Sequence, residues 1–357
     1  MTPATRHMRV VVFEYFSARR AGSDPAALRR AGGAMLRAVR QDLAALPYVG
    51  VAVVPPSARP SATLRRMLRD ADAALIVAPE SGGILVRLLR VAVGEGVALL
   101  GPGPRAARLA GDKLATIRLL ERAGVPVTAS STVPARFEAR LLRRRPPFVL
   151  KPRHGCGSEG VSLVRIADDL DGAVRRARAA AGGGGLLVED YLSGVPASVS
   201  ILVAPRGPGV HAGREGRGRE GRRRIRVLAL GRQRVAGRSA LRYVGGELPW
   251  RHPRGRQAVD AAVRAVAALD RATGDVRGFL GVDLVIGPDG PRVLEINPRL
   301  TSSYLGLRRS LGPGAGRRLC DAMLDPRSRL PPGTGAAVRF DATGRVRGAP
   351  SRRAVRS

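Results

Sequence analysis

The chain has almost no lysine and almost no asparagine. Of its 357 residues, 62 are lysine or arginine, yet only Lys113 and Lys151 are lysines, and Asn297 is the single asparagine. Such depletion is typical of a coding bias that replaces lysine by arginine wherever the position tolerates arginine. An ammonium is a compact point charge and a guanidinium is a wide planar fork, so a tight phosphate site distinguishes them. The two lysines that remain are therefore candidates for phosphate contacts.

Aromatic residues, cysteines and long apolar runs are also scarce. Aromatics make up 3% of the chain and hydrophobic residues 44%, so the cores must be built mainly from Ala, Val and Leu. The two cysteines, Cys156 and Cys320, form no disulfide framework. No apolar run reaches 18 residues, and the one after the basic start is too short for a signal peptide. We therefore expect a soluble, cytoplasmic protein without a membrane span.

Acidic residues are few, and the formal net charge is +34. Such a charge ordinarily points to nucleic acid or an anionic membrane. Here the arginines are scattered along helical segments, and six Phe, five Tyr and one Trp offer few stacking partners for bases. We expect no specific nucleic-acid partner, although the charge raises non-specific affinity for polyanions. A homodimer is compatible with the sequence, which does not fix the oligomeric state.

The first hundred residues alternate between strand-like and helical patterns. Strands are expected at 9–14, 49–54, 73–78 and 97–100, and helices at 25–46, 61–71 and 83–94. This alternation indicates a parallel sheet with crossover helices, an α/β class. No Gly-x-Gly-x-x-Gly follows the first strand, so this Rossmann-like domain, residues 1–104, is not assigned a dinucleotide.

Three further regions are expected, with α+β character in the two lobes. Residues 105–192 predict a helix at 105–124, strands at 148–151 and 161–165 around a glycine-rich loop, a helix at 168–181 and a strand at 186–190. Residues 193–325 predict strands at 197–203 and 225–230, a helix at 256–273, and paired strands at 278–286 and 292–296. A Gly-, Arg- and Glu-rich segment, 206–224, reads as a disordered insert. We expect 326–357 to be a loosely ordered basic tail with one short hairpin around 337–346.

Three oxygen-bearing side chains are predicted to share one face of a hairpin. Glu295 and Asn297 lie two apart on one strand, and a tight turn brings Asp283 opposite them. Mg²⁺ needs such a set when it also holds nucleotide phosphates, whereas the plain alternative is solvated strand carboxylates. Arg299, at the strand exit, could clamp a phosphate or a carboxylate, although one arginine is a weak signal in this chain.

A glycine-rich loop follows Lys151 directly. Its backbone N–H groups can approach a phosphate, although glycine is common in a chain that contains 45 of them. The loop candidates are Gly155, Gly157, Ser158 and Gly160. Cys156 is expected to be a small filler rather than a nucleophile, because no Cys–His–acid constellation accompanies it.

Taken in order, these features resemble the ATP-grasp superfamily. The resemblance covers about 105–311 and rests on Asp112-Lys113, Phe148–Pro152, the glycine loop, Val188–Leu192, Gly281–Asp283 and Glu295–Arg299. It implies an ATP-grasp fold that uses ATP and Mg²⁺, which Mn²⁺ can replace. It further implies phosphate contacts from Lys113, Lys151 and the loop, an adenine hinge of Glu189, Asp190, Tyr191 and Leu192, magnesium ligands Asp283, Glu295 and Asn297, and catalytic roles for Lys151 and Arg299. Many members place a glutamate after the hinge glycine to hold ribose; here Val195 follows Gly194, so the ribose contact stays open.

A narrower resemblance is to tyramine–glutamate ligases. It rests on Phe13-Glu14-Tyr15, Ala78-Pro79-Glu80, Ser198-Val199-Ser200, Gln233, Tyr243–Gly246 and Asn297–Leu307. It implies amide formation through an acyl phosphate, from glutamate and tyramine or a tyrosine-like amine, in methanofuran or methylofuran biosynthesis. Three alternatives stay open. They are another ATP-grasp amino-acid or peptide ligase, a polyanion-binding protein with a vestigial ATP site, and a carboxylase that makes carboxyphosphate.

Overall fold

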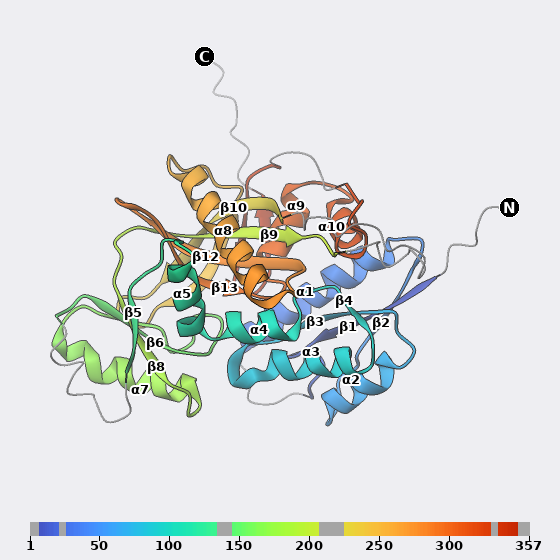
Figure 1. Cartoon of the computed structure of the whole chain (residues 1–357), viewed down its shortest axis with the longest axis horizontal. Coiled ribbons are helices and arrows are strands. Elements are labelled where there is room, and N and C mark those ends of the chain that lie inside the picture. Colours follow the sequence, from blue (N-terminus) through green and yellow to red (C-terminus); the bar gives the residue numbers. More distant parts are fainter. Residues whose placement is uncertain (1–6, 21–25, 134–144, 207–224, 330–334, 349–357) are drawn as a thin grey trace, which may run out of the picture.

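Three β-sheets organise the protein, as the computed structural model in Figure 1 shows. The structure describes residues 7–20, 26–133, 145–206, 225–329 and 335–348. A four-stranded parallel sheet comes first along the chain, a four-stranded antiparallel sheet second, and a seven-stranded antiparallel sheet third. The predicted α/β class is therefore confirmed.

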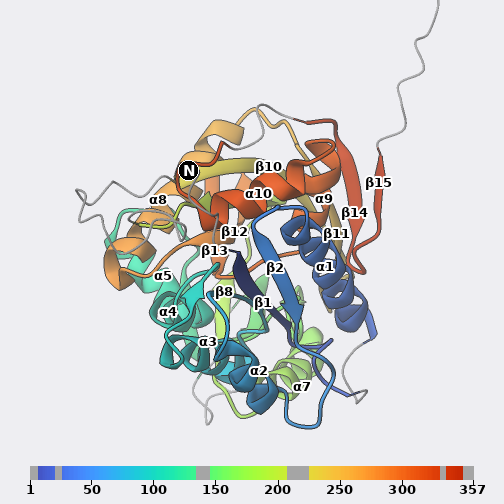
Figure 2. The ribbon, with the colours of Figure 1, turned by 90° about the vertical axis from the view of Figure 1, so that its right-hand side faces the viewer.

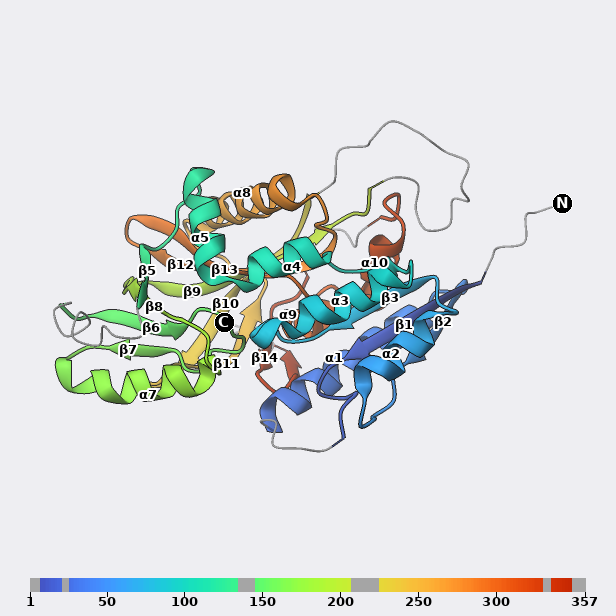
Figure 3. The ribbon, with the colours of Figure 1, turned by 60° about the horizontal axis from the view of Figure 1, so that its bottom comes forward.

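The N-terminal sheet has the alternating architecture that the sequence predicts. Its elements are β1 (Met8–Glu14), α1 (Ala26–Ala44), β2 (Val49–Val53), α2 (Pro60–Leu68), β3 (Ala73–Val77), the 3-10 turn η1 (Ser81–Gly83), α3 (Ile84–Gly94) and β4 (Ala98–Leu99). The strand order is β2-β1-β3-β4. Because strand side chains alternate between faces, Val10 and Val12 pack with α1, while Val11 and Phe13 pack with α2 and α3. The carboxyl ends of β1 and β3 both face the middle of the molecule (Figure 3).

The middle sheet carries the glycine-rich loop. Its elements are β5 (Ser130–Val133), β6 (Phe148–Pro152), β7 (Ser162–Val164), η2 (Ala167–Asp169), α7 (Leu170–Ala181) and β8 (Leu186–Asp190), in the strand order β5-β8-β6-β7. The apolar stripe of α7 packs against this sheet. The sequence did not predict β5, because its Ser-Ser-Thr-Val run shows no apolar pattern.

The single helix predicted over 105–124 is wrong. Two helices take its place, α4 (Pro104–Gly111) and α5 (Lys113–Arg122), and Asp112 between them has extended backbone. The Asp112 carboxylate accepts a hydrogen bond of 3.1 Å from the Ala115 N–H, as aspartate does at a helix N-cap. This break places Lys113 in the first turn of α5.

The third sheet is the largest. Its region contains β9 (Val195–Val203), β10 (Ile225–Ala236), β11 (Arg242–Leu248), α8 (Gly255–Thr273), β12 (Gly278–Gly287), β13 (Gly290–Asn297), α9 (Ser303–Ser310), α10 (Ala315–Leu324), β14 (Val338–Asp341) and β15 (Val346–Gly348). The strand order is β13-β12-β9-β10-β11-β14-β15. An alanine-rich face of α8 packs on the buried residues of β9 and β12. The sequence did not predict β11, α9 or α10.

The last described residues belong to this sheet rather than to a loosely ordered tail. The hairpin expected around 337–346 is present as β14 and β15, and β14 pairs with β11. Val338 and Phe340 are buried in the core that also contains Leu248. The expectation of a loose tail is therefore wrong for 335–348, because this hairpin buries apolar side chains. Of the predicted insert 206–224, only Arg206 is described; it pairs with Asp270 at 3.3 Å.

A buried polar cluster fastens the first region to the third. Asp42 on α1 accepts hydrogen bonds from the Tyr304 hydroxyl at 2.5 Å and from the Arg308 guanidinium at 2.7 Å. Figure 2 views this interface, where α1 packs beside α9 and α10. The cluster fixes α1 over the centre of the molecule. Across the described ranges, no helix combines the length and apolarity that a membrane crossing needs.

Candidate active site

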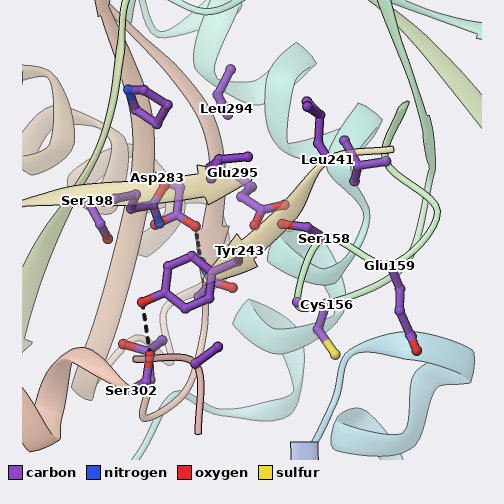
Figure 4. A pocket seen from close by; sticks show the side chains of 18 of the residues that line it. Cys156, Ser158, Glu159, Ser198, Leu241, Tyr243, Asp283, Leu294, Glu295 and Ser302 are labelled. Carbon is purple, nitrogen blue, oxygen red and sulfur yellow. Dashed lines mark hydrogen bonds between the residues drawn. The ribbon is translucent and has the colours of Figure 1, made fainter. Parts of the chain in front are cut away.

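A cavity of about 480 Å³ collects side chains from all three sheets. Figure 4 shows part of its lining, with Asp283 and Glu295 on neighbouring strands and the glycine loop beside them. Of the residues singled out in the sequence, those lining the cavity are Lys113, Lys151, Gly155, Gly157, Ser158, Glu189, Asp190, Tyr191, Leu192, Asp283, Glu295, Asn297 and Arg299. Gly160 does not line it. Motifs spread over nearly 190 positions therefore meet at one place.

The hairpin of β12 and β13 brings the oxygen-bearing side chains together. Asp283 lies opposite Glu295 in the antiparallel register, and Gly281 lies opposite Asn297. The Asn297 amide donates a hydrogen bond of 3.1 Å to the Asp283 carboxylate. Residues directly opposite one another across antiparallel strands share a face, so the expected grouping is present.

The pKa values of the Asp283 and Glu295 carboxylates shift in opposite directions. Burial, and then repulsion by Glu295, raise the pKa of Asp283 to about 6, against the hydrogen bonds that it accepts. Burial also acts to raise the pKa of Glu295, but Lys113, Lys151 and Arg299 together hold it below its usual value. Asp283 is thus a partly buried carboxylate, and no cation of the described residues lies at salt-bridge distance from it.

The chemistry of this oxygen set fits magnesium. A divalent ion would relieve the repulsion between Asp283 and Glu295, and hard oxygen ligands are those that Mg²⁺ prefers. Within the described ranges, no three His, Cys, Asp or Glu side chains group at metal-binding distance. Two carboxylates and one amide would therefore hold the ion jointly with nucleotide oxygens and water.

Both lysines of the chain point into the cavity, and each is paired with a carboxylate. The Lys113 ammonium lies 3.0 Å from a Glu295 oxygen and donates to the Gly155 carbonyl at 2.7 Å. The Lys151 ammonium lies 2.5 Å from a Glu189 oxygen. Their side chains are only 10% and 6% exposed. Burial acts to lower the pKa of Lys113, but Glu295 reverses the effect, so the ammonium stays charged.

The glycine loop turns sharply where it meets the cavity. Gly157 and Ser158 have φ values of 66° and 63°, in the left-handed region that favours glycine. At the base of the loop, Arg153 donates two hydrogen bonds to Asp112, at 2.8 and 2.6 Å. Asp112 therefore anchors the loop. Gly160 packs against α7, where a Cβ atom would lie 2.7 Å from the Ala180 side chain.

The thiol of Cys156 on this loop favours its protonated form. Burial raises the pKa of its thiol to about 11, although Arg299 and Lys113 oppose the shift. A thiol with such a pKa carries almost no thiolate near neutral pH. This agrees with the expectation that Cys156 is a small filler.

Arg299 has a partner that sequence reasoning missed. Its guanidinium donates to both oxygens of Glu80, at 2.8 and 3.2 Å, and the side chains are 14% and 5% exposed. Glu80 follows β3. Through this ion pair, the N-terminal region positions the arginine of the third region. No local pattern could show this, because 219 residues separate the two side chains.

Further polar side chains around Asp283 also lacked an assigned role. Ser198 and Gln233 hydrogen-bond to its carboxylate. The hydroxyl groups of Tyr243 and Ser302 lie 3.2 Å apart, as the dashed line in Figure 4 shows. The only signal for these residues was their occurrence in the narrower family resemblance.

The predicted hinge lies at one end of the cavity. Glu189 to Leu192 all line it, but the Glu189 carboxylate is already held by Lys151 and by the Ser130 hydroxyl at 3.1 Å. The Arg165 guanidinium lies 5.9 Å from the centre of the Tyr191 ring. The Glu189 carboxylate is thus occupied, whereas Asp190, Tyr191 and Leu192 line the cavity as well.

Comparison with known families agrees with this arrangement. A family model described as the ATP-grasp domain matches residues 110–209 and 220–303, and a pre-ATP-grasp domain model matches 35–107. The chain belongs to the ATP-grasp family, and the predicted fold with a preceding domain is confirmed.

Individual relatives are more distant. The chain is 26% identical over 237 residues to a tyramine–L-glutamate ligase of Methanocaldococcus jannaschii, a match covering 66% of this chain and 58% of that protein. It is 30% identical over 225 residues to a D-alanine–D-alanine ligase of Desulforudis audaxviator, covering 59% and 66%. The chain therefore matches about three fifths of the length of these relatives. The solved structure of an ATP-grasp superfamily protein from Archaeoglobus fulgidus superposes with a TM-score of 0.66, at 20% identity over 94% of this chain and 92% of that one, which bears on the fold alone.

Proposed function

We propose that the chain is an ADP-forming carboxylate–amine ligase that joins glutamate to tyramine or a tyrosine-like amine. The observation that carries the proposal is the meeting of both lysines with the set Asp283, Glu295 and Asn297 in one cavity. The similarity to tyramine–glutamate ligases supports the choice of substrates. The product would belong to one-carbon cofactor biosynthesis of the methanofuran or methylofuran kind, and a reaction that draws on ATP and glutamate fits the cytoplasm.

The proposed roles follow from the positions of the side chains. Lys113, Lys151 and the glycine loop bind the nucleotide phosphates, and the hinge from Glu189 to Leu192 lies beside adenine. Asp283, Glu295 and Asn297 hold magnesium, which when bound neutralises phosphate charge. Without ligands, Glu295 forms an ion pair with Lys113, and Glu189 forms one with Lys151. When a nucleotide phosphate binds, each lysine therefore exchanges one anionic partner for another. The desolvation cost of the buried lysines is thus already met in the free protein.

The reaction balances without a covalent protein intermediate. A carboxylate oxygen of the acid attacks the γ-phosphorus, the bond to the bridging oxygen breaks, and ADP leaves. The amine nitrogen then attacks the acyl carbon, the acyl carbon–oxygen bond breaks, and inorganic phosphate leaves while the nitrogen loses a proton. The side chains provide position and charge stabilisation, with Lys113, Lys151 and Arg299 facing the transferring group.

ADP release in the presence of paired substrates tests this proposal. Glutamate with tyramine should give the fastest magnesium-dependent release, and either compound alone should give little. Release with D-alanine alone would instead support an amino-acid ligase like the D-alanine–D-alanine ligases that the chain also resembles. Release with bicarbonate and no amine would support a carboxylase. Strongly salt-dependent nucleic-acid binding without any release would support a vestigial ATP site.

A further inference from the structure

Part of the cavity has mainly apolar walls. It lies where α1 approaches the hairpin of β14 and β15, and Figure 2 shows α1 beside β14. Its apolar lining comes from Phe16, Leu28, Ala31, Met35 and Phe340. None of the proposed nucleotide or magnesium contacts uses these residues. The space adjoins the reacting centre, because Arg299 lines the same cavity.

The carboxylate of Glu14 lines the cavity together with these residues. Glu14 ends β1, is 3% exposed, and accepts hydrogen bonds from Ser17 N–H at 2.8 Å, from the Ser17 hydroxyl at 2.6 Å and from Phe16 N–H at 3.2 Å. Burial, opposed by these bonds, raises its pKa. Within the described parts of the chain, no cation lies at salt-bridge distance from it. The nearest named charge is Arg299, and that guanidinium is bonded to Glu80.

Helix α1 approaches this carboxylate through a glycine. A Cβ atom built on Gly32 would lie 2.4 Å from a Glu14 oxygen, so no side chain fits there without displacing the carboxylate. The neighbouring Gly33 faces elsewhere, and a Cβ there would meet only the Arg37 guanidinium at 3.4 Å and the Ser17 hydroxyl at 4.0 Å. The helix thus covers the Glu14 carboxylate from one side and leaves it facing the cavity.

We propose that Glu14 binds the ammonium group of the amine substrate and that the apolar walls on α1 and β14 hold its hydrocarbon or aromatic arm. The inference rests on the proposed ligation, of which it names one substrate site. A buried carboxylate without a cation is costly, and a ligand ammonium removes that cost. Apolar walls around one convergent polar group are typical of a small-molecule site. The acid substrate fits less well, because its carboxylates would be repelled by Glu14 and left unsolvated by the walls.

Direct binding of three compounds tests the site without requiring turnover. Titration calorimetry would compare tyramine, 4-ethylphenol, which keeps the ring but lacks the amine, and ethylamine, which keeps the amine but lacks the ring. Tyramine should bind roughly tenfold or more tightly than either fragment, the scale of one charged hydrogen bond or one buried ring. Glu14→Gln should weaken tyramine about tenfold and leave 4-ethylphenol unchanged.

A second variant, Gly32→Ala, keeps the charge of Glu14 but changes its position. Gly32→Ala should displace the Glu14 carboxylate and weaken tyramine in the same way, while a helix gains stability from alanine. Gly33→Ala is the matched control on the same turn and should bind tyramine as the wild type does. Thermal unfolding of each variant shows whether it folds, and Gly32→Ala carries the test if Glu14→Gln does not.

Several results would overturn the inference. The wild type could fail to bind tyramine. Tyramine affinity could be unchanged in both Glu14→Gln and Gly32→Ala, or these variants could lose affinity only for glutamate. A different result would reject the ligation instead. If the wild type binds tyramine through Glu14 but releases no ADP with glutamate and tyramine, the amine site stands and the proposed reaction falls.

Discussion

The two ends of the cavity are built in different ways. At the nucleotide end, each key side chain belongs to a short motif, and its position within the motif already indicates its chemistry. Lys151 directly precedes the glycine loop, and Glu295 and Asn297 share a strand. At the substrate end, Glu14, Glu80 and Phe340 come from separate elements and meet only through the packing of the first region on the third. Local motifs indicate the proposed nucleotide site, whereas long-range packing builds the proposed amine site.

The basic residues show the same contrast. Lys113 and Lys151 stand out because the chain has no other lysine. The Arg299 side chain, 14% exposed, is slightly less buried than theirs and also pairs with a glutamate, yet it does not stand out among the many arginines. A residue type that is rare in the chain, such as lysine, can therefore mark a site. A residue type that is common, such as arginine, gives no such signal.

A large effect is expected from Glu295→Gln, at the proposed nucleotide end. This change keeps the size of the side chain but removes a hard anionic ligand and the partner of Lys113. ADP release should fall by roughly 100-fold or more while the fold survives, since removal of one such electrostatic group costs about that much. Steady-state kinetics at increasing magnesium should recover part of the loss. Normal turnover at low magnesium would contradict the magnesium assignment.

A smaller effect is expected where the two ends of the cavity meet. Glu80→Gln breaks the bidentate ion pair and frees Arg299 to move, so kcat should fall about tenfold with less change in the KM for ATP. Glu247→Gln is a matched control, because Glu247 also bridges arginines but in an exposed setting. Equal kinetics for both variants would show that Glu80 does not position Arg299.

The smallest effect is expected from a deletion in the low-complexity segment. Deleting 207–224 and joining the ends with a short glycine bridge should leave ADP release and the unfolding temperature nearly unchanged, because low-complexity segments contribute little burial. The join is short, since Val203 and Ile225 are paired neighbours on β9 and β10. The deletion should also weaken binding to polyanions, measured at several salt concentrations. Loss of folding or of turnover would show that the segment supports the site.

Much of the fold followed from periodic patterns in the sequence. The parallel sheet was predictable because its strands are short apolar runs between amphipathic helices. Three of the failures share one cause, since β5, β11 and the break at Asp112 have little apolar pattern and depend on tertiary partners. The hairpin at 337–346 was predicted, but its place in the core was not, because Phe340 is buried only by residues far away in the chain.

The proposed ATP site depends most on the two lysines, which we infer to survive in this sequence because they contact phosphate. Its most direct test is magnesium-dependent ATP binding and ADP release by the wild type and by Lys113→Arg and Lys151→Arg. Both variants keep the charge that the chain accepts almost everywhere else. We expect ADP release to be abolished in Lys151→Arg and strongly reduced in Lys113→Arg, because a planar fork does not fit where a point charge did. ATP binding and turnover within about twofold of the wild type in both variants would contradict the claim, and with it the ATP site.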